Sequence, residues 1–219
     1  GSDHDDRLIG DGGVNRLSGA DGADVLIGGG AGDVLNGGSG IDTASYETSS
    51  AAVNVDLSQG KALNGDAQGD TLVNIDSLTG SAFNDQLGGD GGFNQLRGGD
   101  GNDRLDGRGS NAGGDLVFGE GGDDYIIARA GGQNSGGLGG FDTIEFAGTS
   151  DTFVELDRLN GVRLGAATGV VFTGFEQFLG REGNDTMLGN DEAETYAGLT
   201  GDDTLRGRGG SDTLIGGSG

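Results

Sequence analysis

The sequence predicts an all-β fold in which short strands stack along one axis as a solenoid. A nine-residue unit, clearest over residues 98–106 as Gly-Gly-Asp-Gly-Asn-Asp-Arg-Leu-Asp, recurs before and after this stretch. Within each unit an apolar residue at position 8 lies between two outward positions, which is the period of a β-strand. No stretch has the pattern of a helix of ordinary length, so we expect almost no helix.

Each unit supplies one corner, one carboxylate and one core side chain. Glycines at positions 1, 2 and 4 allow backbone conformations with φ > 0 that other residues avoid. In the unit of residues 98–106, position 6 is Asp103 and position 8 is Leu105. One unit cannot bury its apolar residue alone, so repetition at a fixed period implies stacked units that contact only their neighbours.

The composition favours binding of cations. The 219 residues include 53 Gly, no Pro and no Cys, with 32% hydrophobic residues and a formal net charge of -24. Such a chain leans towards disorder in water without counter-ions. Its charge argues against nucleic acid and anionic membranes. The lack of Cys excludes disulfides and thiolate metal sites but leaves a secreted origin open. No apolar run approaches the ~20 residues that cross a bilayer.

Residues 1–45 form a first array of five units in strict register. Position 6 is occupied by Asp6, Asn15, Asp24, Asp33 and Asp42. Position 8 is occupied by Leu8, Leu17, Leu26, Leu35 and Ala44.

Residues 46–79 form a first spacer, in which this register is lost. Apolar residues alternate instead at Val53, Val55 and Leu57 and return between Leu72 and Leu78. This pattern predicts two or three strands joined by turn-rich segments. The spacer either continues the stack or bulges from it.

Residues 80–145 form a second array with two irregular units. Position 6 is occupied by Asp85, Asn94, Asp103, Asp115, Asp124 and Asp142, and position 8 by Leu87, Leu96, Leu105, Val117, Ile126 and Ile144. The unit of residues 107–118 is three residues too long. The unit of residues 128–136 has Gln133 where the carboxylate is expected, so we predict that it binds no metal.

Residues 146–179 form a second spacer that repeats the first at an offset of 100 residues. Asp76 matches Glu176, and Ile75 and Leu78 match Phe175 and Phe178. A third array over residues 180–219, which we expect to be truncated, follows. Its position 6 is occupied by Asp185, Glu194, Asp203 and Asp212, and its position 8 by Met187, Tyr196, Leu205 and Leu214.

These units resemble the nonapeptides of the RTX (repeats-in-toxin, hemolysin-type calcium-binding) family. Residues 65–81, Gly-Asp-Ala-Gln-Gly-Asp-Thr-Leu-Val-Asn-Ile-Asp-Ser-Leu-Thr-Gly-Ser, resemble the linkers between blocks of adenylate cyclase toxin-type RTX domains. The resemblance implies a right-handed parallel β-roll, with two units per turn and calcium ions in the loops between turns. It also implies export from a Gram-negative bacterium by a type I system, with folding on external calcium.

If two units make one turn, position-6 carboxylates 18 residues apart lie on one edge at the inter-strand spacing of ~4.8 Å. Such charges repel by about 1–4 kcal/mol, and a divalent cation between them would bridge them. The resemblance implies that carbonyls at positions 2 and 4 complete the site, a set of oxygens that suits Ca²⁺ better than Mg²⁺ or zinc. The predicted carboxylate ligands are Asp6, Asp24, Asp33, Asp42, Asp85, Asp103, Asp124, Asp142, Asp185, Asp203 and Asp212, and the carbonyl ligands are Gly22, Gly38, Gly40, Gly99, Gly101, Gly201 and Gly210.

Simpler interpretations exist for several of these residues. A single Asp in a Gly-rich loop commonly caps its own turn, and only its recurrence in three arrays favours calcium. Asn15, Asn94 and Glu194 are expected to mark weakened or empty sites. His4 is expected to be an exposed loop residue rather than a ligand. Adjacent acids such as Asp123 and Asp124 face apart in a strand-loop repeat, so we expect no catalytic residues and no enzyme.

Three functions remain open. The first is a structural, calcium-loaded roll that couples folding to secretion and is secreted as a monomer. The second is an adhesin or glycan-binding module that uses Phe172, Phe175 and Phe178 or the long loop near Ser110, and burial of these phenylalanines would count against it. The third is an auxiliary domain of a secreted toxin or enzyme. Calcium is the only cofactor expected.

Overall fold

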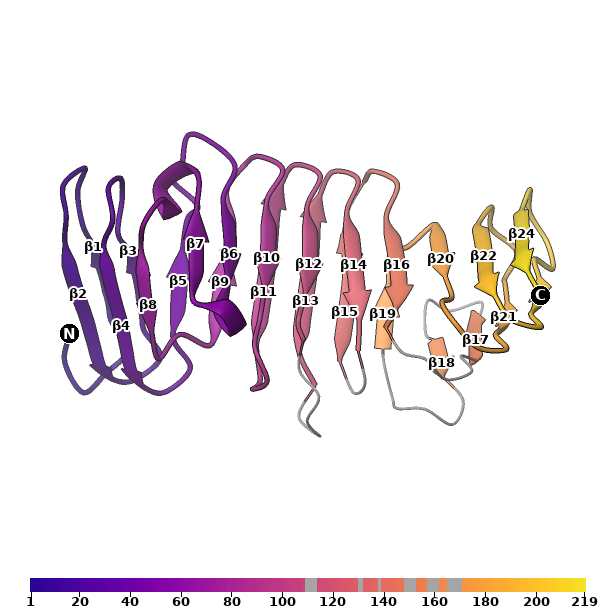
Figure 1. The fold of residues 1–219 in the computed structure, drawn as a ribbon, viewed down its shortest axis with the longest axis horizontal. Helices are drawn as coiled ribbons and strands as arrows, with labels where there is room; N and C mark the ends of the chain where they lie inside the picture. The colour runs from indigo at the N-terminus through magenta and orange to yellow at the C-terminus, as the bar shows by residue number, and fades with distance from the viewer. Residues whose placement is uncertain (109–113, 130–131, 138, 148–152, 157–161, 165–170) are drawn as a thin grey trace.

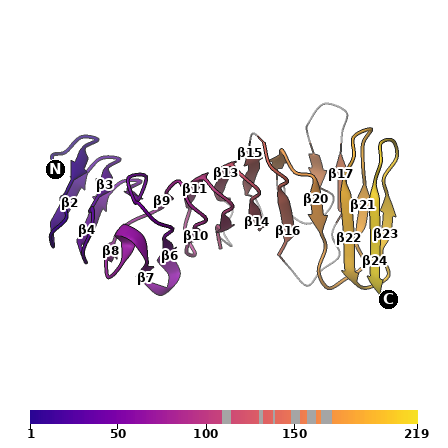
Figure 2. The same cartoon turned by 90° about the horizontal axis from the view of Figure 1, so that it is seen from above.

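The chain forms an elongated all-β solenoid with its two ends at opposite ends of the stack (Figures 1 and 2). The computed structural model describes residues 1–108, 114–129, 132–137, 139–147, 153–156, 162–164 and 171–219. The only helical elements among them are two short 3-10 turns, η1 (Leu57–Gln59) and η2 (Gly65–Ala67). The predictions of an all-β roll and of almost no helix are confirmed.

The described strands form four sheets that make up two faces. One face holds an eight-stranded sheet of β1 (Arg7–Ile9), β3 (Val25–Ile27), β5 (Thr43–Ser45), β9 (Ser77–Thr79), β11 (Gln95–Asp100), β13 (Leu116–Gly121), β15 (Gln133–Gly137) and β19 (Val171–Thr173), and then a four-stranded sheet of β18 (Val162–Leu164), β17 (Phe153–Leu156), β21 (Thr186–Leu188) and β23 (Thr204–Arg206). The other holds a three-stranded sheet of β2 (Arg16–Asp21), β4 (Val34–Ser39) and β8 (Thr71–Val73), and then a nine-stranded sheet of β7 (Lys61–Leu63), β6 (Asn54–Asp56), β10 (Gln86–Gly88), β12 (Arg104–Asp106), β14 (Tyr125–Ala128), β16 (Thr143–Phe146), β20 (Gln177–Leu179), β22 (Thr195–Thr200) and β24 (Thr213–Ser218).

Two units make one turn. Leu8 pairs with Leu26 and Leu87 with Leu105, each 18 residues along the chain and in parallel register. The corners need glycine where turns approach each other closely. Gly40 has φ +142°, and a Cβ there would lie 1.8 Å from the carbonyl oxygen of Gly22 in the turn before. A side chain at this corner would therefore force the turns apart.

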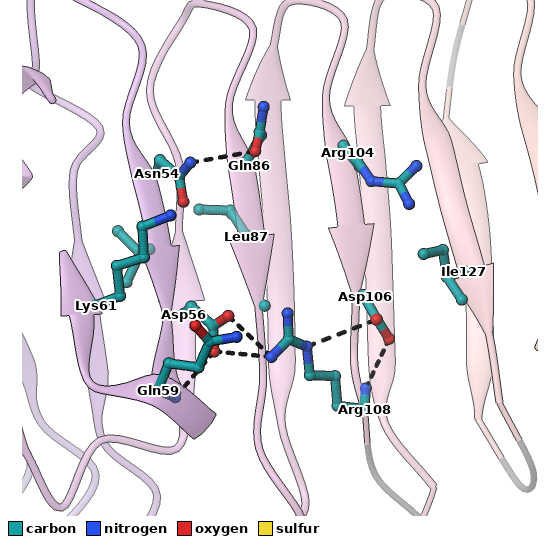
Figure 3. A pocket seen from close by; sticks show the side chains of 12 residues that line it. Asn54, Asp56, Gln59, Lys61, Gln86, Leu87, Arg104, Asp106, Arg108 and Ile127 are labelled. Carbon is teal, nitrogen blue, oxygen red and sulfur yellow. Dashed lines mark hydrogen bonds and ion pairs between the residues drawn. The ribbon is translucent and has the colours of Figure 1, made fainter. Parts of the chain in front are cut away.

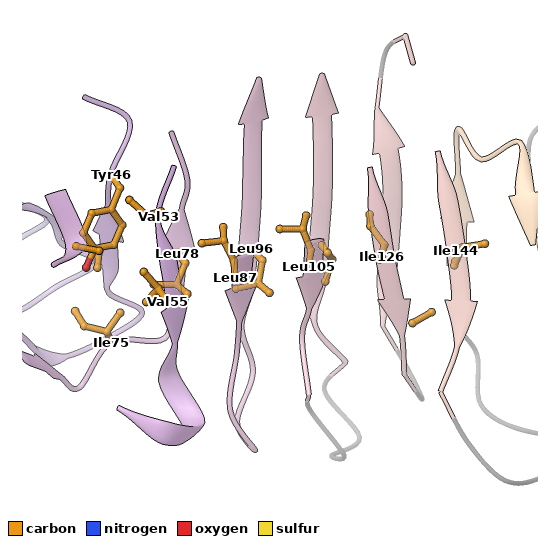
Figure 4. Close-up of a cluster of buried hydrophobic side chains, with 14 of the residues drawn as sticks. Tyr46, Val53, Val55, Ile75, Leu78, Leu87, Leu96, Leu105, Ile126 and Ile144 are labelled. Atoms are coloured by element: carbon orange, nitrogen blue, oxygen red, sulfur yellow. The ribbon is translucent and has the colours of Figure 1, made fainter. Parts of the chain in front are cut away.

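The core is one column of side chains between the two faces, as Figure 4 shows. Leu26, Leu96, Leu105 and Ile144, all at position 8, are fully buried. Most turns of the arrays contribute two such residues, because the strands are only three to six residues long. The spacers add others, among them Tyr46 and Phe175, whereas Leu214 at the C-terminal end is 48% exposed. The apolar burial per residue is therefore small, and the core alone offsets little of the entropy lost on ordering the glycine loops.

Both spacers continue the roll and add one hairpin each. β5 pairs with β9 across the first spacer and β16 with β20 across the second, in both cases with a separation of 34 residues. The hairpins β6–β7 and β17–β18 are the antiparallel pairs of the described chain. The first spacer thus has four strands rather than the two or three predicted. β7 was missed because its one inward residue is the small Ala62.

The register predicted for residues 128–136 is wrong by one position. Gln133 pairs with Leu116 and Asn134 with Val117, so Gly132, and not Gln133, aligns with Asp115. The loop is one residue shorter than the repeat requires, and the inward residue is the polar Asn134, 6% exposed. No carboxylate occupies position 6 of this turn.

Candidate calcium sites

The position-6 carboxylates form ladders along the edges of the roll. In each pair, the backbone N–H of one residue donates to a carboxylate oxygen, Oδ1, of the equivalent residue one turn later. The five pairs proposed from spacing are Asp6 with Asp24 (2.8 Å), Asp24 with Asp42 (2.9 Å), Asp85 with Asp103 (2.7 Å), Asp124 with Asp142 (2.8 Å) and Asp185 with Asp203 (2.9 Å). Asp33 accepts from Asn15 (2.7 Å) and Asp212 from Glu194 (3.2 Å) in the same way. The fold therefore brings these residues side by side.

Three carboxylates that the sequence analysis did not select carry the ladders into the spacers. Asp76 accepts from the N–H of Asp42 (3.0 Å), Glu176 from that of Asp142 (2.8 Å) and Asp70 from that of Asp33 (2.8 Å). The match of Asp76 with Glu176 at an offset of 100 was the available signal for two of them.

The second carboxylate oxygen is buried without a hydrogen-bond partner at many of these positions. This holds among the described residues for Oδ2 of Asp24, Asp33, Asp42, Asp103, Asp124 and Asp203 and for Oε2 of Glu194. A buried ionised oxygen without a partner is costly and calls for an explanation. Asp6, Asp85 and Asp185 differ, because this oxygen accepts the N–H of position 2 in their own unit.

Backbone carbonyls approach several of the unpartnered oxygens. A Cβ built on Gly19 would lie 1.8 Å from Oδ2 of Asp24 and 2.5 Å from the carbonyl oxygen of Gly37. A Cβ on Gly98 would likewise lie 2.1 Å from Oδ2 of Asp103. Only glycine leaves this space open. The carbonyl glycines predicted from the resemblance all have positive φ: Gly22, Gly38, Gly40, Gly99, Gly101, Gly201 and Gly210.

These donor atoms fit a calcium ion. They are oxygens from carboxylates and flexible glycine loops, the kind of ligand that Ca²⁺ takes in numbers of 6–8. Burial raises the pKa of Asp103 and of Asp124 to about 7, and repulsion from neighbouring carboxylates adds to the rise. Burial also raises the pKa of Asp142 to about 6. The roll thus holds carboxylates where their charge is disfavoured unless a cation lies beside them.

Comparison with known families agrees with this geometry. A family model described as "RTX calcium-binding nonapeptide repeat (4 copies)" matches residues 1–33, 9–44, 79–111, 110–132 and 188–219, which is more than half of the chain. The chain belongs to the RTX calcium-binding repeat family. The matches leave out most of both spacers. No curated protein matches the sequence.

A second ladder, at position 5 of the RTX units, was also missed. The N–H of Asn102 donates to Asn84 (3.0 Å), that of Asp123 to Asn102 (3.0 Å) and that of Phe141 to Asp123 (2.7 Å). Asp5 and Asn184 accept in the same way. The signal was the Asn or Asp that precedes many position-6 carboxylates. These side chains support the loops from outside.

Two of the three phenylalanines considered for ligand binding are core residues. Phe175 and Phe178 are buried, and Phe178 stacks on Tyr196 with ring centroids 5.2 Å apart. The side chain of Phe172, like the loop near Ser110, lies outside the described part of the chain. His4 is exposed, as predicted.

A polar pocket of about 260 Å³ lies on the outer surface of the nine-stranded sheet (Figure 3). Arg108 spans it and pairs with Asp56 (2.8 Å) and Asp106 (3.6 Å). Lys61 and Arg104 lie on either side of Gln86 (Figure 3), and neither makes an ion pair with the described residues. The charged side chains of the pocket are three cations and two anions, in a chain of net charge -24.

Proposed function

We propose that this chain is a calcium-dependent folding module of a type I-secreted bacterial protein. The observation that carries the proposal is the set of buried carboxylate oxygens without hydrogen-bond partners. Calcium, when bound, would be the positively charged partner that these oxygens lack. Any ion that binds only the folded state stabilises it by RT ln(1 + [Ca²⁺]/Kd) for each independent site.

The chain's own residues prepare the binding sites and make folding depend on calcium. Asp24, Asp103 and Asp124 each hold one oxygen on a backbone N–H and leave the other for the metal. The glycine loops keep room for the carbonyls. Without calcium the thin core and the charge repulsion favour the unfolded chain, which suits passage through a secretion channel; outside the cell, calcium would fold it into a stiff scaffold.

Two further points belong to this proposal. RTX repeats are typical of secreted proteins, and no helix of the described chain is long and apolar enough to cross a membrane. We propose no catalytic activity for the module, because its ladder carboxylates are bonded to backbone N–H groups inside the roll rather than gathered at an open cleft.

Circular dichroism during a calcium titration, with magnesium as control, tests the proposal. A coil-to-β transition with calcium but not magnesium supports it. A β spectrum already complete in calcium-free buffer at neutral pH would refute calcium-driven folding and leave a preformed roll.

The pocket of Figure 3 favours a second candidate function, binding of an anionic glycan. Lys61 and Arg104 would pair with the acidic group, and the amides of Asn54, Gln59 and Gln86 with hydroxyls. In saturating calcium, Lys61→Glu and Arg104→Glu should each weaken binding to a sulfated glycan. Binding by both variants as tight as that of the wild type would refute it, and so would wild-type binding of a neutral glucan as tight as that of the sulfated one.

A further inference from the structure

We propose that the RTX units of residues 10–18 and 89–97 are metal-free, with an Asn amide in place of the ion. The inference rests on the proposed calcium function and adds which units do not take part. Both units share one sequence pattern, Gly-Asp-Gly-Gly-Val-Asn and Gly-Asp-Gly-Gly-Phe-Asn, with Asp at position 2 and Asn at position 6.

Asn94 is fully partnered by the chain itself. It is 1% exposed. Its Nδ2 donates to the carbonyl oxygen of Asp76 (2.9 Å) and to Oδ1 of Asp90 (3.3 Å), and its Oδ1 accepts the N–H of Asp90 (2.7 Å). The amide cannot be reversed, because Oδ1 would then face two other oxygens.

Asn15, in the first turn of the roll, repeats the contacts with the position-2 Asp. Its Oδ1 accepts the N–H of Asp11 (2.7 Å), and its Nδ2 donates to Oδ1 of Asp11 (3.2 Å). The same Asp11 oxygen accepts the N–H of Gly13 (2.9 Å), as Asp90 accepts that of Gly92 (2.7 Å). Because the same hydrogen bonds occur in two separate loops, they are not a chance feature of one loop.

Many units with Asp at position 6 differ at the same place, the exceptions including those of Asp6, Asp85 and Asp185. Oδ2 of Asp24 and of Asp103 is buried without a partner, whereas no polar side-chain atom of Asn94 is left in that state. A neutral amide also adds no charge to the ladder. Its N–H groups satisfy a carbonyl and a carboxylate, which are the two kinds of oxygen that calcium would bind.

The backbone at position 2 differs as well. Ala20, Gly38, Gly99 and Glu120 have positive φ in units whose position-6 Asp has an unpartnered oxygen, whereas Asp11 and Asp90 do not. In the Asn units the position-2 N–H therefore points at the position-6 side chain and closes the loop. The loop holds its shape through its own hydrogen bonds.

Calcium counting by isothermal titration calorimetry on the full chain tests this inference. Asn94→Ala should leave the number of bound ions unchanged and raise the calcium concentration at the folding midpoint. Its matched control, Asp103→Ala, should lose about one ion. Loss of an ion from Asn94→Ala would overturn the inference.

A converse variant keeps the test decisive if Asn94→Ala does not fold. Asp90→Gly/Asn94→Asp restores the pattern of the calcium units and should bind about one more ion than the wild type. An unchanged count in this folded variant would also overturn the inference. If the wild type binds no calcium at all, the proposed function fails instead, so the two failures are distinguishable.

Discussion

At the scale of the residue, a position-6 carboxylate with an unpartnered oxygen performs two separate tasks. One oxygen of Asp103 accepts the buried N–H of Asp85, and the other lies unpartnered beside the carbonyl-lined space at Gly98. The first contact holds two turns together whether or not a metal is present. The second oxygen destabilises the folded chain until a cation binds it. Stability and calcium affinity are therefore linked in one side chain.

Asp103→Ala should consequently cost stability even in saturating calcium. The N–H of Asp85 loses its acceptor, which costs about 1–3 kcal/mol for a buried group, and one ion is lost as well. Urea denaturation in saturating calcium measures the effect. Asp100→Ala, which removes an exposed carboxylate from the same unit, is the control and should change stability little. Equal effects of the two substitutions would contradict the ladder.

Gly40→Ala should destabilise the roll severely. Its φ of +142° is strained for any other residue, and the new Cβ would lie 1.8 Å from the carbonyl oxygen of Gly22. Gly30→Ala is the matched control, since no heavy atom lies within 4 Å of a Cβ there and its φ is not positive. Thermal melts in calcium should show a large drop for the first variant and little change for the second. Similar melts would show that the corners tolerate side chains.

The spacers preserve the ladders at the scale of the element. Asp76 replaces a position-6 Asp in the first spacer, and Glu176 does so in the second. Each spacer also adds a hairpin at the same relative place, so that β7 lies beside β8 and β18 beside β19. The chain is thus a repeat of repeats, in which β5–β9 and β16–β20 pair in the same register 100 residues apart.

Asp76→Ala and Glu176→Ala should therefore have similar effects. Each removes the acceptor of one buried ladder N–H, on Asp42 or on Asp142, at about 1–3 kcal/mol. Asp21→Ala, an exposed carboxylate in the first array, is the control. Unfolding of all three variants should be followed under identical calcium. An effect of only one of the two spacer variants would show that the spacers are not equivalent.

The sequence allowed the arrays to be predicted well, because their period of nine ties each side chain to one place in the turn. Leu105 and Asp103 occupy the places that the spacing gave them. The hairpins and the slip at Gly132 were not predictable, since Ala62 gives no apolar signal and Asn134 occupies an inward position that elsewhere is apolar. The unpartnered oxygens required coordinates, because spacing does not show which atom is buried.

Proton binding and calcium binding compete for the same buried charge at the scale of the whole molecule. In the calcium-free roll the pKa values of Asp103 and Asp124 are about 7 and that of Asp142 is about 6, against about 3.9 in the unfolded chain. Folding without calcium therefore takes up protons. The resulting stability is fully present below pH ~4 and is lost as the pH rises through the folded values near 6–7.

The β signal of the calcium-free chain should accordingly be larger at pH 5 than at pH 8, and saturating calcium should reduce the difference. Circular dichroism in buffers freed of calcium by dialysis measures it. Asp103→Asn/Asp124→Asn/Asp142→Asn should flatten this pH dependence, because the buried groups that titrate are gone. Asp21→Asn/Asp100→Asn/Asp202→Asn removes the same charge from exposed sites and should not. If the two triple variants behave alike, net charge rather than the buried ladder sets the pH response.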